Sequence, residues 1–245
     1  MNKINQKKIR ELKEIINESN NIVFFGGAGV STASGLKDFR SKDGLYNEKN
    51  NLLNVSPEFM LSVSCFYSFT KEFYKYYKVN MNSLNAKPNI VHEYLAKLEQ
   101  LGKLKAIITQ NIDGLHQKAG SKNVLELHGT IYKNHCIKCG KEYSAEYVFN
   151  SEDIPRCECG SIIKPNVVLY GEMLPEDFVL AEKYISECDL LIVAGTSLIV
   201  EPAASLINYF RGKNLVIINN DETPYDKKAT LIINEDLTSV FKLLS

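Results

Sequence analysis

The chain has 245 residues, and its 29 lysines and arginines balance its 29 aspartates and glutamates, so its formal net charge is zero. Hydrophobic residues make up 44% of the chain and charged residues 24%, which excludes a disordered or collagen-like protein. A chain of this length forms one large domain, or one domain with a small appended module. Because a protein that coats nucleic acid usually needs net positive charge, we expect no direct nucleic-acid partner.

The apolar runs and the first residues predict a protein of the cytoplasm. Runs such as Leu190–Ala194 are too short to cross a bilayer, so no membrane contact is expected. The first residues alternate charged and aliphatic side chains and lack the apolar centre of a secretory signal. We therefore expect a reducing compartment, in which disulfides are disfavoured.

Strands and helices are predicted to alternate along the first half of the chain. Residues 3–17 place Ile9, Leu12 and Ile16 on one face of a helix. Residues 22–25 predict a buried strand that runs into a glycine-rich turn and the start of a helix. The remaining predictions for this half are a helix over 90–101, with Leu101 on its apolar face, and strands over 105–109 and 124–127.

The second half continues the alternation, with two interruptions in the chain as a whole. Its predicted elements are strands over 167–170, 189–194 and 215–218 and a helix that opens at Pro175. Short β-branched strands between helices predict an α/β fold with a mostly parallel sheet, covered on both faces. The stretches 41–85, rich in aromatic residues, and 131–164, which holds two cysteine pairs, are predicted to be insertions between strands.

The cysteine pairs predict a structural zinc site. Cys136 and Cys139 are separated by seventeen residues from Cys157 and Cys159, and each pair is followed by a glycine. Four thiolates in two close pairs can surround one tetrahedral Zn²⁺ and leave no position open for catalysis. Disulfides or free thiols are the alternatives. The remaining cysteines, Cys65 and Cys188, are expected to be buried apolar residues.

Polar residues follow three of the predicted strands. The turn at 26–29 could bring backbone amides to a pyrophosphate or be purely structural, and Thr32 replaces the third glycine of a strict G-x-G-x-x-G motif. Residues 109–113 could position a ribose or a water, or could simply cap a helix. His128 could take a proton from a hydroxyl, or could be a structural histidine.

Together these motifs resemble the sirtuin (Sir2) family of NAD-dependent protein deacylases, in its bacterial form. The resemblance covers nearly the whole chain, in the expected order. It rests on residues 27–40, 109–113, 128–129, 167–172 and 195–197 and on the four paired cysteines. It implies that residues 1–40, 86–130 and 165–245 form a Rossmann-like NAD-binding domain. It also implies a small domain, built from a helical insertion (41–85) and a zinc ribbon (131–164).

The resemblance implies an enzyme, a transferase or hydrolase that removes acetyl or longer neutral acyl groups from protein lysines. NAD is cleaved in the reaction, giving nicotinamide and O-acyl-ADP-ribose. The alternatives are a protein ADP-ribosyltransferase or NAD hydrolase that uses the same pocket, and a binding module without catalysis.

The family pattern also implies a role for individual residues. Catalysis falls to His128, as general base, and to Asn111. The NAD-binding residues are Gly27, Ala28, Gly29, Thr32, Asp38, Phe39, Arg40, Gln110, Asn111, Ile112, Asp113, Gly195, Thr196, Ser197, Asn219, Asp236 and Leu237. Those that bind an extended acetyl-lysine peptide are Val168, Leu169, Tyr170, Gly171 and Glu172, with Tyr74 and Tyr77 near the acyl group.

Two positions depart from the family pattern. Lys37 replaces a proline of the family's segment, which loosens the turn there. Tyr77 stands where desuccinylating members carry an arginine, so a succinyl carboxylate loses its bidentate partner, and Lys78 is the nearest substitute cation. We therefore predict a preference for neutral acyl groups.

Overall fold

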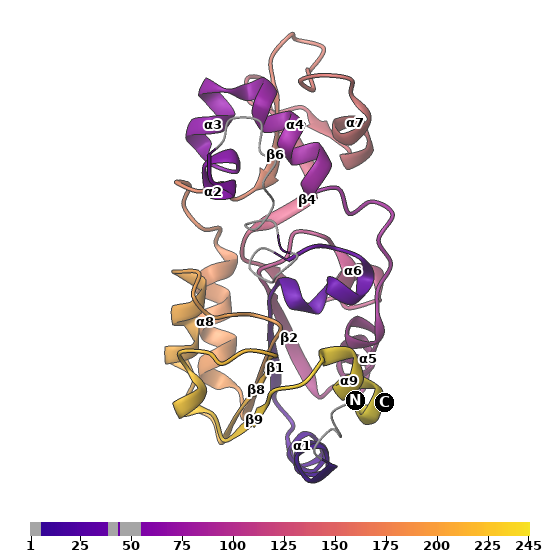
Figure 1. Cartoon of the computed structure of the whole chain (residues 1–245), viewed down its shortest axis with the longest axis vertical. Coiled ribbons are helices and arrows are strands. Elements are labelled where there is room, and N and C mark those ends of the chain that lie inside the picture. The colour runs from indigo at the N-terminus through magenta and orange to yellow at the C-terminus, as the bar shows by residue number, and fades with distance from the viewer. Residues whose placement is uncertain (1–5, 39–43, 45–54) are drawn as a thin grey trace.

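A six-stranded parallel sheet forms the larger part of the molecule (Figure 1). The computed structural model describes residues 6–38, 44 and 55–245. The strand order is β3-β2-β1-β7-β8-β9, and every neighbouring pair is parallel. The strands are β1 (Ile22–Gly26), β2 (Leu104–Thr109), β3 (Val124–Glu126), β7 (Leu190–Ala194), β8 (Asn214–Ile218) and β9 (Leu231–Ile233).

Helices cover both faces of this sheet. One face packs against α1 (Gln6–Glu18), α5 (Ile90–Gln100) and α9 (Leu237–Leu244), and the other against α8 (Asp177–Glu187) and the 3₁₀ segment η4 (Ala203–Tyr209). Phe24 points to the first face and Phe25 to the second, as the two-residue repeat of a strand requires. All residues of β1 and β7 are buried, which explains why these strands are continuous apolar runs.

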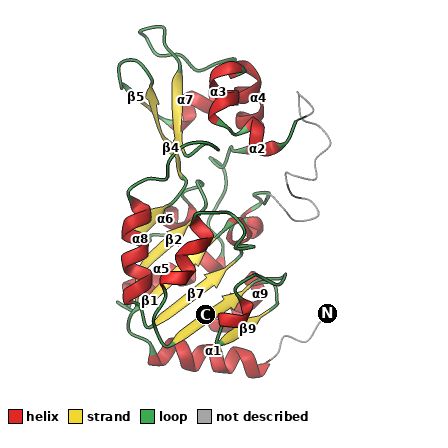
Figure 2. Cartoon of the chain, turned by 90° about the vertical axis from the view of Figure 1, so that its left-hand side faces the viewer, coloured by secondary structure: helices red, strands yellow, loops and turns green. Residues whose placement is uncertain are grey.

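A second, smaller module lies beyond the carboxyl ends of the parallel strands (Figures 1 and 2). Its strands form the antiparallel order β5-β4-β6. Its elements are α2 (Pro57–Met60), α3 (Val63–Ser68), α4 (Thr70–Asn80), β4 (Gly129–Cys136), β5 (Glu142–Tyr143), α7 (Ala145–Asn150) and β6 (Ile163–Val167). Aromatic residues of α3 and α4 pack against Val148, Phe149 and Ile163 in one hydrophobic cluster, so the helical and cysteine-bearing segments share a core.

The strand order places a ligand-binding crevice between β1 and β7. The chain builds β2 and β3 on one side of β1, and β7, β8 and β9 on the other. Ligands of open parallel sheets bind where the strand order reverses in this way, beyond the carboxyl ends of the strands. The small module faces the same edge, which makes this edge the place to look for a site.

Three details of the predicted elements are wrong. No α-helix follows the glycine turn: two 3₁₀ turns, η1 (Ala28–Val30) and η2 (Thr32–Ser34), take its place, because the small and β-branched residues there favour helix weakly. The strand predicted over 167–170 is confirmed only at Val167, where β6 ends, and Tyr170 pairs with Ser62 in an isolated bridge outside the named strands. Leu101 lies at the end of α5 and is 65% exposed.

The other predicted elements agree with the structure to within a few residues. The remaining short helices are α6 (Leu115–Lys118) and η5 (Asp226–Lys228). None of the helices in the described part of the chain has the length and apolar character that a bilayer crossing demands.

Candidate active site

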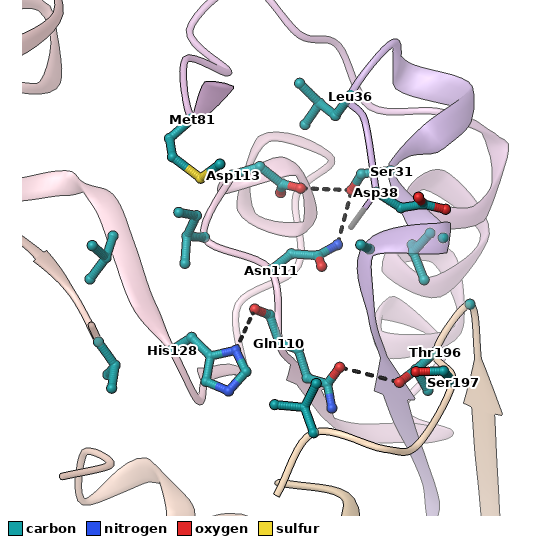
Figure 3. A pocket seen from close by; sticks show the side chains of 18 of the residues that line it. Ser31, Leu36, Asp38, Met81, Gln110, Asn111, Asp113, His128, Thr196 and Ser197 are labelled. Atoms are coloured by element: carbon teal, nitrogen blue, oxygen red, sulfur yellow. Dashed lines mark hydrogen bonds between the residues drawn. The ribbon is translucent and has the colours of Figure 1, made fainter. Parts of the chain in front are cut away.

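A cavity of about 790 Å³ lies between the sheet edge and the small module. The loops after β1, β2, β7 and β8 line one side, and residues of α4 and of the β6–α8 connection line the other. Figure 3 shows how side chains from these separate loops converge. Such a large concave site with polar groups from several loops is typical of ligand binding.

His128 lines the cavity and carries a defined tautomer. Its Nδ1 donates a hydrogen bond to the Gln110 carbonyl oxygen at 2.9 Å, since a carbonyl can only accept (Figure 3). The proton is therefore on Nδ1, and Nε2 carries the lone pair. Burial lowers the pKa of His128, and the bond to Gln110 opposes that effect. The imidazole is thus neutral at pH 7 and able to accept a proton.

The turn that follows His128 explains its place. Gly129 has φ +72, and a Cβ there would lie 2.0 Å from the Asn166 carbonyl oxygen. Only glycine allows β4 to start so close to β6. The close pairing of β4 with β6 therefore fixes the position of His128, which directly precedes β4.

A chain of hydrogen bonds joins Asn111 to Asp113 through Ser31 (Figure 3). The Asn111 amide nitrogen donates to the Gly27 carbonyl oxygen at 3.1 Å and to Ser31 Oγ at 3.0 Å. Ser31 Oγ donates in turn to Asp113 Oδ2 at 2.7 Å, and Asp113 Oδ1 accepts from the Leu115 amide. Burial raises the pKa of Asp113, and the bonds from Ser31 and Leu115 oppose the rise. The chain holds these side chains in one orientation.

The loops after β1 and β7 contact each other through their backbones where they line the cavity. The Gly29 amide donates to the Gly195 carbonyl oxygen at 2.9 Å, and a Cβ on Gly29 would lie 2.8 Å from Gly195 Cα. Beside this contact, Thr196 Oγ1 donates to Gln110 Oε1 at 3.2 Å. The glycine turn therefore serves the packing of two loops, and its 3₁₀ geometry offers no helix dipole to a phosphate.

Most residues predicted to bind NAD line this cavity. They are Ala28, Gly29, Thr32, Asp38, Gln110, Asn111, Ile112, Asp113, Gly195, Thr196, Ser197, Asn219, Asp236 and Leu237. Gly27 does not line it and instead supplies a carbonyl oxygen to Asn111. Asp236 also caps α9, accepting from the Ser239 amide at 2.8 Å. Phe39 and Arg40 lie outside the described residues.

The polar groups that line the cavity fit a dinucleotide. Gln110 Nε2 is buried and, among the residues that the structure describes, has no hydrogen-bond partner. An unsatisfied buried donor costs free energy unless a ligand oxygen meets it. Ribose and phosphate oxygens supply such acceptors, and the cavity is long enough to run from Gln110 to the loop after β8.

The predicted peptide-binding segment lies on the same cavity. Val168, Leu169, Tyr170, Gly171 and Glu172 all line it, together with Tyr77. Tyr77 is stacked between Phe73 and Phe149, with ring centroids 5.5 and 5.4 Å away. Tyr74 does not line the cavity, and its hydroxyl donates to the Ile163 carbonyl oxygen. Tyr74 is therefore part of the small module's core.

The paired cysteines are arranged for one metal ion. The Sγ atoms of Cys136, Cys139, Cys157 and Cys159 all lie within 4.8 Å of one another. Two of the distances, Cys136 to Cys159 and Cys139 to Cys157, are 3.5 Å. Tetrahedral Zn²⁺ with bonds of about 2.3 Å holds sulfurs about 3.8 Å apart, so the donor set fits zinc. Cys65 and Cys188 are buried in hydrophobic clusters, as predicted.

Sequence reasoning missed several lining residues. Ser31 is one of the small polar residues after the glycine turn that could wrap a dinucleotide, but it was not among the residues predicted to bind NAD, although it bonds both Asn111 and Asp113. Its position in the motif, directly before Thr32, was the available signal. Apolar and loop residues had no such signal; they are Leu36, Met81, Met173, Phe178, Val200 and Pro202.

The pattern of the Sir2 family matches residues 27–202, more than half of the chain. The chain belongs to the Sir2 family. Among curated relatives, an NAD-dependent protein deacetylase of Clostridium tetani is 54% identical over 94% of both chains. That of Clostridium acetobutylicum is 55% identical, over 96% of this chain and 97% of the relative.

Solved Sir2 structures share the fold. A Sir2 structure with a deacetylated p53 peptide and 3′-O-acetyl-ADP-ribose has a TM-score of 0.89 and 41% identity, and covers 96% of each chain. Another, of Sir2 with a p53 peptide and NAD⁺, has a TM-score of 0.84 and 42% identity, and covers 96% of this chain and 95% of that one. The predicted Sir2 resemblance and Rossmann-like fold are thus confirmed.

Proposed function

We propose that this Sir2-family chain is an NAD-dependent protein-lysine deacetylase. It removes acetyl groups from lysines of extended peptide segments and yields nicotinamide and O-acyl-ADP-ribose. The observation that carries the proposal is the neutral His128, held by Gln110 on the same cavity as the chain from Asn111 to Asp113. Relatives named NAD-dependent protein deacetylases, at 54% and 55% identity, support it.

In this proposal each residue of the site has a separate task. When bound, NAD supplies a ribose whose bond to nicotinamide can be broken, so that the acyl oxygen can reach the sugar. His128 Nε2 accepts a proton from a ribose hydroxyl, because its Nδ1 proton is committed to Gln110. Asn111 and Asp113, fixed through Ser31, orient the ribose and nicotinamide. Burial of the site excludes water, which would otherwise compete for the reactive sugar.

In this proposal the parallel-sheet domain and the small module have separate roles. We propose that residues 1–40, 86–130 and 165–245 hold NAD, and that 41–85 and 131–164 shape the acyl-peptide side with a structural zinc. The segment 168–172 lines the cavity, as do residues 195–197 of the loop 195–199, and the two segments suit an extended peptide between them. Because zinc binding requires reduced thiols, we further propose that the protein works in the cytoplasm.

Turnover of an acetyl-lysine peptide with and without NAD tests this function. We expect deacetylation only with NAD, and one nicotinamide released for each acetyl group removed. His128→Ala is expected to lower kcat by about 100-fold or more, because it removes the proton acceptor. His135→Ala is the matched control, since His135 lies on β4 and does not line the cavity.

The same assay separates the alternatives. Deacetylation without NAD, or without stoichiometric nicotinamide release, would contradict the proposal. Labelled NAD that leaves a stable ADP-ribose on protein would favour a transferase, and nicotinamide release that is independent of peptide would favour an NAD hydrolase.

A preference for neutral acyl groups is the second prediction. Lys78 cannot serve a succinyl carboxylate, because its Nζ donates to the Ser151 carbonyl oxygen at 2.6 Å and Ser151 Oγ at 2.7 Å, outside the cavity lining. Lys37, on the loop after β1, is the only lysine or arginine among the described lining residues. Within the described part of the chain, a carboxylate beside the aromatic Tyr77 would therefore be buried without a paired cation, which is costly.

Butyryl and succinyl peptides provide a matched comparison, because both acyl groups have four carbons and only succinyl carries a carboxylate. We expect kcat/KM for butyryl to exceed that for succinyl by about 100-fold, which corresponds to about 2.7 kcal/mol. Equal values for the two peptides would overturn this prediction.

A further inference from the structure

Lys164 is a buried lysine in β6, next to the cavity but not among its described lining residues. The residue is 9% exposed, and its Nζ donates to Glu172 Oε2 at 3.1 Å. The same Nζ lies 3.3 Å from the carbonyl oxygens of Pro165 and Val167. A buried ammonium is tolerated only when paired and hydrogen-bonded in this way.

The Glu172 carboxylate connects this lysine to the backbone of the segment 167–172. Glu172 Oε2 accepts from the Leu169 amide at 2.9 Å. The backbone amide of Glu172 donates to the Leu169 carbonyl oxygen at 2.9 Å. Between them Gly171 adopts φ +95, a left-handed conformation that suits glycine. The turn from Leu169 to Glu172 is thus closed by one backbone and one side-chain bond, and Lys164 fixes the side chain.

Backbone bonds tie this turn to both sides of the site. The Val168 amide donates to the carbonyl oxygen of His128 at 2.8 Å. The Tyr170 amide donates to the Leu61 carbonyl oxygen, and the Tyr170 carbonyl oxygen accepts from the Val63 amide, both at 3.0 Å. A shift of this turn would therefore change the position of the cavity-lining segment 168–172 relative to His128 and to α3.

We propose that Lys164 is a positioning residue for the acyl peptide and acts through Glu172. The pair holds the segment 167–172 in the conformation against which an extended peptide docks. Glu172, which the sequence suggested as a peptide contact, then has an internal role. The inference rests on the proposed deacetylase function and adds to it a residue outside the Sir2 motif segments described above.

Three variants test the proposal: Lys164→Met, Glu172→Met and the double variant. We expect each single variant to raise KM for the acetyl peptide by about tenfold, because both remove the charge-assisted bond between Lys164 and Glu172. Lys164→Met also removes the Nζ bonds to Pro165 and Val167, and Glu172→Met also removes the acceptor of the Leu169 amide. KM for NAD and the zinc content should stay within about twofold of the wild type. Lys213→Met and Glu18→Met are the matched controls, since that ion pair is exposed, lies away from the cavity and spans 3.3 Å.

The double variant separates positioning from stability. Glu172→Met leaves the buried Lys164 charge without its carboxylate, and Lys164→Met leaves the partly buried Glu172 without its cation. Each single change therefore lowers the melting temperature, whereas replacing both charges restores part of it. The Leu169 amide still lacks its acceptor, so the proposal requires that peptide KM stays raised in the double variant. This variant also decides the matter if a single variant fails to fold.

Two results would overturn the inference. One is a peptide KM that returns to the wild-type value together with the melting temperature, which indicates a merely structural pair. The other is an unchanged peptide KM in a folded variant. Failure of the proposed function is distinguished by the wild-type protein, which would then show no NAD-dependent deacetylation in the same assay.

Discussion

Two buried histidines, His92 and His116, lie close together near the polar chain of the active site. Their ring centroids are 4.7 Å apart, and His116 follows Asp113 by three residues. His92 Nδ1 accepts from the Asn89 amide at 3.2 Å, and both ring nitrogens of His116 lack partners among the described residues. Burial lowers the pKa of His92 to about 4; burial, followed by repulsion from His92, lowers that of His116 to about 3.

This pair predicts that the protein loses stability in acid. The folded pKa values lie below the unfolded value of about 6.5, so the unfolded chain binds more protons below that pH. The free energy of unfolding is therefore highest above pH 6.5 and falls as the pH drops toward the folded values. His116→Leu should reduce the fall between pH 7 and pH 5 by about 2 kcal/mol. Urea unfolding at several pH values measures this, and an unchanged slope with pH would contradict the assignment.

Asp113 shows why residue roles were only partly predictable. Its sequence context left open a cap or a ligand-orienting role, and the structure combines a cap with a bond into the site: Oδ1 accepts from the Leu115 amide, and Oδ2 accepts from Ser31. Ser31 lies 82 residues earlier in the chain, so this bond exists only after folding. Motif order could indicate that these residues meet, but not which hydrogen bonds join them.

At the scale of elements, the sequence predicted best where local pattern and burial agree. The strands β1, β2, β7 and β8 are apolar runs buried in the sheet, and all were predicted to within one residue at each end. The 3₁₀ turns after β1 were missed, since the Gly29 amide bonds Gly195 across the sheet edge. The strand predicted over 167–170 ends early because its amides bond elsewhere: the Leu169 amide donates to the Glu172 side chain in a local turn, and the Tyr170 amide donates to the distant Leu61 carbonyl oxygen.

The whole molecule has its hydrophobic cores on both sides of the candidate site. Two clusters cover the faces of the parallel sheet, and a third fills the small module. The strand β4 connects the modules directly: it begins beside His128 and ends at Cys136, a ligand of the proposed zinc site. We therefore expect a folded zinc ribbon to stabilise the position of His128 through β4.

Zinc removal should consequently lower activity at least tenfold without unfolding the parallel sheet. A ribbon that loses its metal loses folding free energy, because its four thiols no longer share one ion. We expect about one zinc per chain in the wild type, and a chelator or Cys139→Ser should lower both zinc content and kcat/KM at least tenfold. Cys188→Ala is the matched control, since Cys188 lies in the hydrophobic cluster beside α8 and should retain zinc.

The same samples show whether the effect is confined to the small module. Hydrogen exchange should rise in β4, β5 and β6 after zinc loss and stay low in β1 and β7, which are buried in the parallel sheet. Full activity in a zinc-free protein would refute the proposal that the zinc ribbon stabilises the active site through β4. Exchange that rises equally in both sheets would show instead that the two modules unfold as one cooperative unit.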